Sequence, residues 1–308
     1  MREQQSNQEA AKYARMYYLH TLTPLHVGVG RGVGFIDLPI LREKVTGWPI
    51  VPGTAVKGVL ADYHKADEQG RKANPKLSRA FGSGGDDNAN SGALVMTDAR
   101  IICLPVRSYY GTFAWVTSPD ALSRYARDLE AAGQTAPKGL PKPAENKAAV
   151  PADPATALAE SGNIYFEDLD FTVASDGAAG DWAKFLAAQI FPQDGDWQNV
   201  FRQRFAVVHG DVFNFLCDTG TEVQAHVRID DARKTVAKGA LWYEECLPAE
   251  AVLAGLVWCD RVFGNGNGTK PEELLSDYAS GEHALQIGGK ATVGKGRVRC
   301  IFSNGGMK

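Results

Sequence analysis

The sequence predicts an α+β domain, because strand and helix patterns are mixed along it without regular alternation. Apolar and polar residues alternate at 221–230 and 240–248, which is typical of half-buried strands. The continuous apolar run at 251–260 has the length of a strand buried on both faces. Helical periodicity lies between such segments, at 52–66 and 271–279. A doubly wound fold would need strictly alternating strands and helices, so the mixture favours α+β.

The elements can be assigned in order. The first strand is expected at 15–22, followed by a glycine loop and by a helix with Thr54 as its N-cap. A glycine- and asparagine-rich loop is expected at 82–92. Further strands are predicted at 93–104, 113–116, 164–173, 207–208 and 283–288, and a closing strand at 297–302; further helices are predicted at 121–132, 181–190, 196–204 and 210–217.

Residues 133–161 differ from the rest of the chain in composition. They are rich in proline and alanine and contain no aromatic residue. Such a segment buries too little apolar surface to offset the loss of chain entropy. We therefore expect a flexible surface insertion within a single domain of residues 1–308.

The bulk composition indicates a globular, cytoplasmic protein. Hydrophobic residues make up 44% of the 308 residues and charged residues 22%, values typical of globular proteins. No apolar run approaches the roughly 18–20 residues that cross a bilayer, and the polar start carries no apolar signal segment. The five cysteines are widely spaced without a CxxC pair, which predicts reduced thiols and no cysteine-based zinc site.

The net charge and the charge distribution point in opposite directions on nucleic-acid binding. The net charge of −3 lacks the basic excess that marks many nucleic-acid-binding proteins. The stretch from Gln286 to Lys308, however, holds five basic residues and no acidic one. A local basic patch can hold a phosphate backbone even in an acidic protein.

The segment 19–60 contains several side chains that could bind a ligand or take part in catalysis. It contains His26 in a glycine loop, then Asp37, Arg42 and, on the predicted helix, Lys57. We predict that Arg42 contacts RNA. A lone aspartate beside proline is most often a turn residue, yet one carboxylate can also hold a Mg²⁺ that keeps most of its waters. His26 is either a structural histidine or a base- or phosphate-contacting group, and Lys57 is either solvated or a phosphate contact near a helix start.

The two glycine loops also have two interpretations. Neither 28–34 nor 288–296 fits a nucleotide-binding motif, because the first leads into an extended segment and the second lacks the Ser/Thr after its lysine. The glycines can serve tight turns, or they can let bare backbone approach a polyanion. The second interpretation assigns RNA contacts to Gly288, Gly289, Lys290, Lys295 and Arg297.

Glu244 and Glu245 are adjacent in a predicted strand, so their side chains should point to opposite faces. The residues alone allow two ordinary solvated carboxylates or one carboxylate that reaches a site.

Four segments carry a family resemblance: TPLHVGVG (23–30), IDLPI (36–40), GWPIVPGTAVKGVL (47–60) and LQIGGKATVGKG (285–296). In this order they resemble the RAMP superfamily of CRISPR proteins, and within it the backbone RNA-binding subunit of the type III-B (Cmr) effector complex. The resemblance implies a modified ferredoxin-like (RRM-like) core with a protruding thumb hairpin, which corresponds here to 221–247. Within the hairpin, His226 and Arg228 would contact RNA.

The resemblance also implies an activity and partners. Asp37 matches the residue that cleaves target RNA, with Glu244 or Glu245 as an accessory, and the reaction would use a divalent metal, Mg²⁺ or Mn²⁺, held by Asp37. Lys57 lies on a helix that contacts the guide RNA in this group. The expected partners are a guide crRNA, a single-stranded target RNA, further copies of the chain in a filament and other Cmr subunits, with no membrane.

Three alternatives stay open at this stage. The chain could be a structural guide-binding subunit in which Asp37 only forms a turn. It could be a metal-independent endonuclease that processes guides through a histidine. It could also be a single-strand binder unrelated to CRISPR.

Overall fold

A computed structural model describes residues 13–303 except 31, 33, 84–89, 231 and 263–267. The greater part of the predicted loop 82–92 and the end of the basic C-terminal stretch therefore lie outside the described residues. No helix among the described residues is long and apolar enough to cross a membrane.

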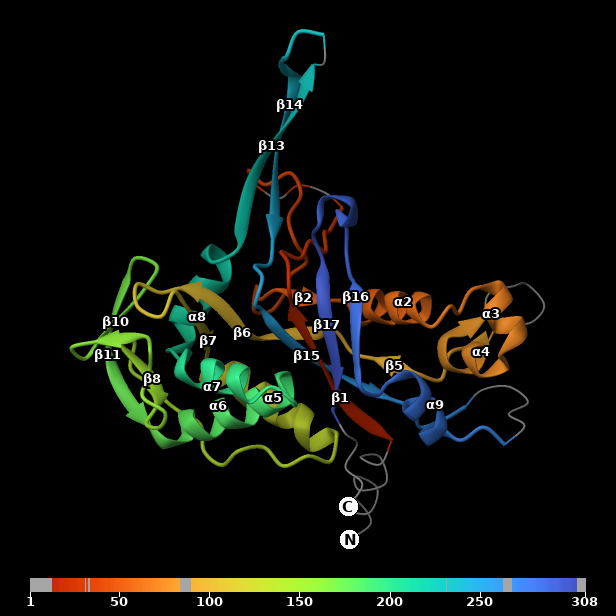
Figure 1. The fold of residues 1–308 in the computed structure, drawn as a ribbon, viewed down its shortest axis with the longest axis horizontal. Helices are drawn as coiled ribbons and strands as arrows, with labels where there is room; N and C mark the ends of the chain where they lie inside the picture. Colours follow the sequence, from red (N-terminus) through yellow and green to blue (C-terminus); the bar gives the residue numbers. More distant parts are fainter. Residues whose placement is uncertain are drawn as a thin grey trace.

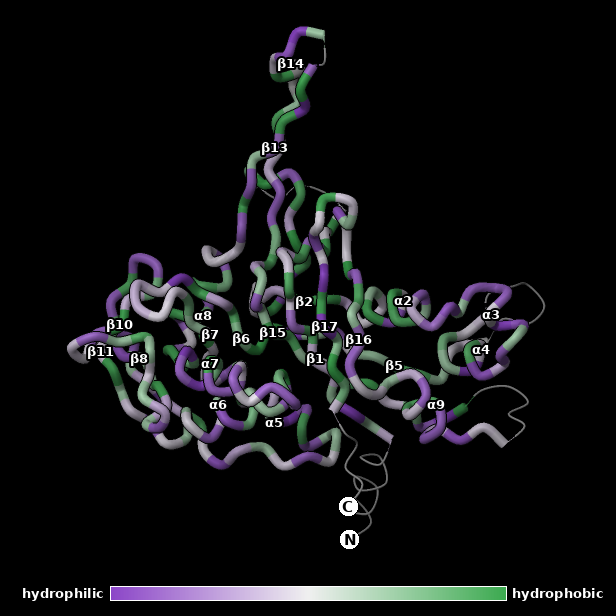
Figure 2. Tube along the Cα trace, in the orientation of Figure 1, coloured by the Kyte–Doolittle hydropathy of each residue, from purple (hydrophilic) through white to green (hydrophobic). Residues whose placement is uncertain are grey.

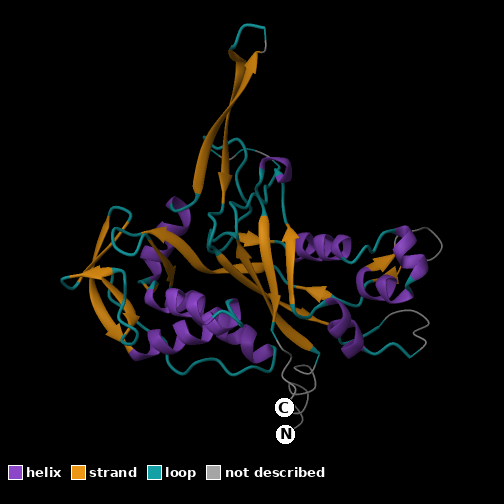
Figure 3. Ribbon diagram, in the orientation of Figure 1, coloured by secondary structure: helices purple, strands orange, loops and turns teal. Residues whose placement is uncertain are grey.

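A mixed sheet forms the centre of the molecule (Figures 1 and 3). Its strands follow the order β16-β17-β1-β15-β6-β7-β12-β8-β11-β10-β9, with the short β2 and β5 attached at the side. The strands, in chain order, are β1 (Ala14–Thr21), β2 (Ile50–Val51), β5 (Val95–Met96), β6 (Ala99–Arg107), β7 (Phe113–Thr117), β8 (Lys147–Pro151), β9 (Ala159–Glu160), β10 (Asn163–Phe166), β11 (Leu169–Asp176), β12 (Phe205–Val207), β15 (Val252–Trp258), β16 (Glu282–Gln286) and β17 (Arg297–Phe302). The apolar run predicted as a central strand is β15, which lies between β1 and β6.

Helices cover both faces of the sheet. The helices are α2 (Gly53–Tyr63), α3 (Glu68–Ala73), α4 (Pro75–Phe81), α5 (Pro119–Ala131), α6 (Gly177–Ile190), α7 (Gly195–Gln203), α8 (Gly210–Thr219) and α9 (Pro271–Tyr278). Successive residues of β1 enter different cores: Tyr17 belongs to the cluster that includes side chains of α2 and α8, and Tyr18 to the cluster that includes side chains of α5 and α6. This period-2 alternation is what a strand buried on both faces requires. The mixed α/β architecture is as predicted.

The expected N-cap at Thr54 is wrong. Helix α2 begins at Gly53, and its cap position is Pro52, two residues before Thr54, with no side-chain cap. The carboxylate of Asp98 instead accepts a hydrogen bond from the Gly53 N–H at 2.9 Å. Only glycine fits there, because a Cβ would lie 2.3 Å from the carbonyl oxygen of Met96.

The prediction of a flexible insertion at 133–161 is also wrong. Strand β8 lies inside the sheet, parallel to β11 and next to β12, and its residues 148–151 are buried. Ala148, Ala149 and Val150 are each at most 2% exposed. Small side chains suit this position, because α6 packs against the strand. The alanine-rich composition therefore reflects close packing rather than a lack of structure.

The predicted hairpin is present and stands away from the body (Figure 1). Strands β13 (Glu222–Asp230) and β14 (Thr235–Cys246) pair in antiparallel register, with an irregularity between Val227 and Ile229. Apolar and polar residues alternate along β13 (Figure 2). Both sides of its outer part are exposed to solvent, unlike those of an ordinary core hairpin.

Candidate functional site

Asp37 lies where the loop after β1 meets the base of the hairpin. The backbone N–H of Tyr243, on β14, donates to Asp37 Oδ2 at 2.8 Å. The next residue, Leu38, pairs with the same strand, because its N–H donates to the Tyr243 carbonyl at 3.0 Å. The Asp37 side chain is otherwise exposed. The hairpin backbone therefore orients one carboxylate oxygen and leaves the other open to solvent.

Glu245 fastens this loop to the hairpin from the buried side. Its side chain is only 3% exposed and accepts hydrogen bonds from the Ile40 N–H at 3.0 Å, the Thr221 hydroxyl at 2.8 Å and Arg42 Nη2 at 2.6 Å. Arg42 also donates to the carbonyls of Gly47 and Cys217. Arg42 was predicted to contact RNA, but here its guanidinium is engaged within the protein.

Glu244 points to different partners, as strand alternation predicted. It is 2% exposed by side chain and forms ion pairs with Lys290 at 2.9 Å and Lys295 at 3.0 Å. Burial alone would raise its pKa, but the hydrogen bonds and charges of the two lysines outweigh burial and lower the pKa to about 2. Neither Glu244 nor Glu245 offers a free oxygen to solvent, and a part for either in cleavage stays a prediction.

His26 lies behind the same cluster. The ring is buried, and its Nδ1 lies 2.7 Å from the Glu245 carbonyl oxygen, so Nδ1 carries the proton. Its backbone carbonyl accepts from the Gly289 N–H, and a Cβ on Gly288 would lie 2.3 Å from that carbonyl oxygen. Gly288 and Gly289 therefore serve close backbone packing here; an added role on RNA stays a prediction.

His26, Glu244 and Cys246 place three potential metal-ligand atoms within 4.8 Å of one another. The ammonium of Lys295 already lies among them, 3.0 Å from Glu244 and 3.1 Å from the Cys246 sulfur. Because this positive charge neutralises the cluster, the arrangement is an internal ion-pair network and does not resemble a metal cage. All five cysteines are free and buried.

The other predicted RNA contacts differ in accessibility. Lys57 is half-buried, its ammonium donates to the Leu94 carbonyl at 2.6 Å, and burial lowers its pKa. Arg297 and Arg228 are exposed. His226 stacks on Trp242 across the hairpin, with ring centroids 5.6 Å apart.

Sequence reasoning thus grouped residues that the fold only partly brings together. The hairpin base brings together seven of them: His26, Asp37, Arg42, Glu244, Glu245, Lys290 and Lys295. Lys57 instead bonds to the Leu94 carbonyl. His226 and Arg228 lie farther out, on β13. Two residues at the base were missed: Phe35 is 74% exposed, and its ring lies 6.3 Å from that of Tyr243. An aromatic residue two positions before Asp37, in a glycine-rich loop, was the available signal.

The residues around Asp37 could hold a divalent cation only weakly, through a single protein ligand. One open carboxylate oxygen suits a Mg²⁺ that keeps most of its waters. Glu244 and Glu245 are engaged in ion pairs with basic side chains, so within the described residues Asp37 is the candidate ligand at this place.

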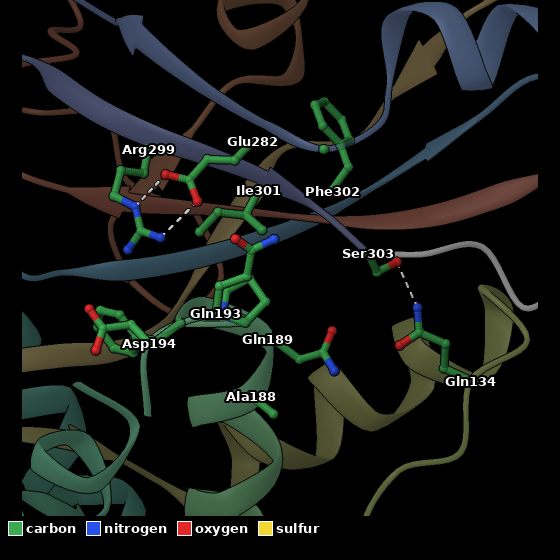
Figure 4. Close-up of a pocket in the computed structure, with 13 residues that line it drawn as sticks. Gln134, Ala188, Gln189, Gln193, Asp194, Glu282, Arg299, Ile301, Phe302 and Ser303 are labelled. Atoms are coloured by element: carbon green, nitrogen blue, oxygen red, sulfur yellow. Dashed lines mark hydrogen bonds and ion pairs between the residues drawn. The ribbon is translucent and has the colours of Figure 1, made fainter. Parts of the chain in front are cut away.

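A cavity of about 620 Å³ lies in another part of the molecule (Figure 4). It is lined by the connection between α6 and α7 and by one end of β16 and β17, including Asp194 and Ser303. Arg299 in this cavity already forms a two-pronged ion pair with Glu282. The cavity lies away from Asp37 and adds nothing to its chemistry.

Comparisons with known proteins show the family of the chain. The profile of the RAMP superfamily matches residues 18–299. The chain is 34% identical over 298 residues to the CRISPR system Cmr endoribonuclease Cmr4 of Pyrococcus furiosus, covering 94% of this chain and 96% of that protein. It is 33% identical to the CRISPR system Cms endoribonuclease Csm3 of Streptococcus thermophilus over only 28% of this chain and 46% of that protein.

Solved structures share the fold. The crystal structure of oligomeric Cmr4 from Pyrococcus furiosus superposes with a TM-score of 0.72 at 27% identity, covering 94% of this chain and 98% of that one. A chain of a type III-B Cmr-β complex bound to cognate target RNA superposes with a TM-score of 0.70 at 16% identity, covering 94% of this chain and 97% of that one. Since the family profile spans most of the sequence and a relative above 30% identity covers nearly all of it, the chain belongs to the RAMP superfamily.

Proposed function

We propose that this chain is the guide-RNA-binding backbone subunit of a type III-B CRISPR effector complex and that it cleaves guide-paired target RNA. The observation that carries the proposal is the exposed Asp37 carboxylate, held by the Tyr243 N–H at the base of a protruding hairpin. The similar Cmr4 of Pyrococcus furiosus is named an endoribonuclease, and it forms an oligomer in its crystal structure. Partners of the same kind are proposed here: a guide RNA, a target RNA, further copies of this chain and other Cmr subunits, in a cytoplasmic ribonucleoprotein.

The proposed reaction is an internal transesterification of RNA. The 2′-oxygen of a ribose attacks the adjacent phosphorus and forms the new O–P bond, while the bond from phosphorus to the 5′-oxygen breaks. The 2′-hydroxyl proton leaves and the 5′-oxygen gains a proton, which gives a cyclic phosphate and a 5′-hydroxyl. The free oxygen of Asp37 is suited to accept the proton directly or through water, since its other oxygen is fixed by the backbone.

A divalent metal at Asp37 belongs to the same proposal. Bound there, Mg²⁺ or Mn²⁺ would neutralise charge that develops on the phosphate. The protein contributes one oxygen, so most ligands would come from water and RNA, and binding should be weak without RNA. Retained cleavage in EDTA would contradict this part and would favour a metal-independent endonuclease.

The hairpin supplies the second element of the mechanism. Its exposed outer part carries Val227, Ile229 and Leu241, each at least 46% exposed. Apolar side chains on a two-stranded projection suit contact with unstacked bases in an RNA duplex. A distorted target strand would let its 2′-hydroxyl align with the scissile phosphate beside Asp37 of a neighbouring copy.

Asp37→Ala in the assembled complex tests the proposal. Target cleavage should fall at least about 100-fold, the range for removal of an acid–base group, while guide and target binding change little. Asp170→Ala removes an exposed carboxylate on β11 and serves as the matched control. If Asp37→Ala cuts at the rate of Asp170→Ala, the chain is a structural guide-binding subunit or uses another group.

A further inference from the structure

We propose that Phe35 and Tyr243 form a stacking shelf for one unpaired nucleobase of the target strand, next to the scissile phosphate. The inference rests on the proposed function and names a subsite of the same site. Phe35 is 74% exposed, and Tyr243 is 36% exposed. The structure gives neither ring a core role, which calls for an explanation when both lie beside the exposed carboxylate.

The two rings are placed by the same contacts that place Asp37. Tyr243 donates its backbone N–H to Asp37 Oδ2. Phe35 precedes Asp37 by two residues, which span at most about 7 Å of chain. A base resting on the rings would therefore lie within one nucleotide of a phosphate at Asp37.

The geometry of the ring pair leaves stacking faces open. The ring centroids are 6.3 Å apart and the planes are inclined by 79°, an edge-to-face contact. In such a contact only one ring contributes a face, so the other ring keeps both of its faces. Across the hairpin, Tyr243 is paired with Ala225, whose small side chain does not cover the tyrosine.

The backbone at Gly34, next to Phe35, is also open among the described residues. Gly34 has a φ of +61°, and apart from its chain neighbours no described atom lies within 4 Å of the position that a Cβ would take. A planar aromatic surface beside bare backbone is how proteins bind single-stranded bases, since every base has a π-face and needs no matched hydrogen bonds. The ligand that fits is an unpaired base, either a purine or a pyrimidine, without regard to sequence.

The shelf can be tested in two assays with Phe35→Leu, which keeps an apolar side chain and removes the flat ring. The matched control is Tyr109→Leu, because Tyr109 is 78% exposed and lies in the β6–β7 connection, against Tyr110 and Tyr165. In the first assay, the full chain is titrated with a single-stranded uridine 12-mer that carries one central 2-aminopurine. Wild type should quench the fluorescence, and Phe35→Leu should bind about 5- to 100-fold more weakly with less quenching; Phe35→Trp should restore both.

In the second assay, the assembled complex cuts targets with an abasic nucleotide on either side of the cleavage position. Wild type should slow by a similar factor on one of these targets, whereas Phe35→Leu should cut the abasic and the normal target equally. If Phe35→Leu matches Tyr109→Leu in both assays while wild type binds and cuts RNA, the shelf is wrong and the proposed function stands. If Phe35→Leu only weakens self-association, the ring is a protein contact and the shelf is wrong. If wild type neither binds nor cuts RNA, both inferences fail together.

Discussion

Replacing Glu245 by alanine should destabilise the protein and impair cleavage, because this buried carboxylate ties the Asp37 loop to the hairpin. The change leaves the Ile40 N–H without its acceptor, at a residue 5% exposed. An unsatisfied buried donor costs about 1–3 kcal/mol, and breaking a buried ion pair costs about 3–5 kcal/mol. Arg42 keeps its bonds to the carbonyls of Gly47 and Cys217, so the low end applies.

We therefore expect Glu245→Ala to lower the free energy of unfolding by about 3 kcal/mol. For a chain of this length, that corresponds to a fall in Tm of about 6 °C, at about 2 °C per kcal/mol. Glu245→Gln should lose about half as much, since its amide oxygen still accepts one bond. Cleavage should fall more than RNA binding in both variants, because the Asp37 loop loses its fixed position.

Thermal unfolding followed by circular dichroism measures the effect. Glu282→Ala is the matched control: it breaks the ion pair with Arg299, in which the Glu282 side chain is 43% exposed. An exposed pair contributes at most about 1 kcal/mol, so this variant should shift Tm by less than about 2 °C. If Glu245→Ala has the same Tm as Glu282→Ala, the Glu245 carboxylate does not hold the loop, and the reasoning is refuted.

Two further predictions concern the body of the protein. The rings of His64 and His283 lie 5.5 Å apart, and burial lowers the pKa of both; because the folded pKa lies below the unfolded value, stability should be complete above about pH 6.5 and fall as the pH drops. Changing both residues to glutamine should flatten the dependence of Tm on pH between 7.5 and 5.5, and an unchanged slope would contradict the assignment. Deleting 147–151 should abolish soluble folding because this strand separates β12 from β11 in the sheet, whereas shortening the hairpin tip at 230–234 should leave the fold intact in the same expression assay.

The sequence was informative where side-chain pattern alone decides the structure. The buried run of β15 and the alternating strands of the hairpin follow from polarity at single positions, so both could be predicted. Strand β8 could not, because its alanines are buried only by virtue of their neighbours in β11 and β12. The composition of a segment indicates how much apolar surface the segment can bury by itself. It does not show how much of that surface other segments of the fold will cover.

The roles of charged residues were harder to predict for a related reason. Lys57, Arg42 and Lys295 were all assigned to RNA, yet each bonds to a protein group far away in the sequence. Lys295 reaches Glu244 across 51 residues, and Arg42 reaches Glu245 across 203 residues. A positive charge in the sequence identifies a donor but does not identify its acceptor. The exposure of Asp37 could be predicted, because a polar loop beside a glycine run indicates exposure directly.

The position of Asp37 is coupled to the hairpin through three successive residues of β14. Tyr243 holds the Asp37 carboxylate, Glu244 binds the lysines of the 288–296 loop, and Glu245 binds Arg42. Because adjacent residues on a strand face opposite sides, the two glutamates clamp the hairpin base from both sides. Among the described residues of the outer hairpin, Val227, Ile229 and Val236 are each at least 46% exposed and therefore accessible to a ligand. A force on the tip would therefore act on a strand whose base is fixed by buried charge, and Asp37 would move only if one of these ion pairs broke. If the outer hairpin moves when RNA binds, this arrangement would keep the carboxylate in place, so the position of the cut should depend on the base of the hairpin and not on the sequence of its tip.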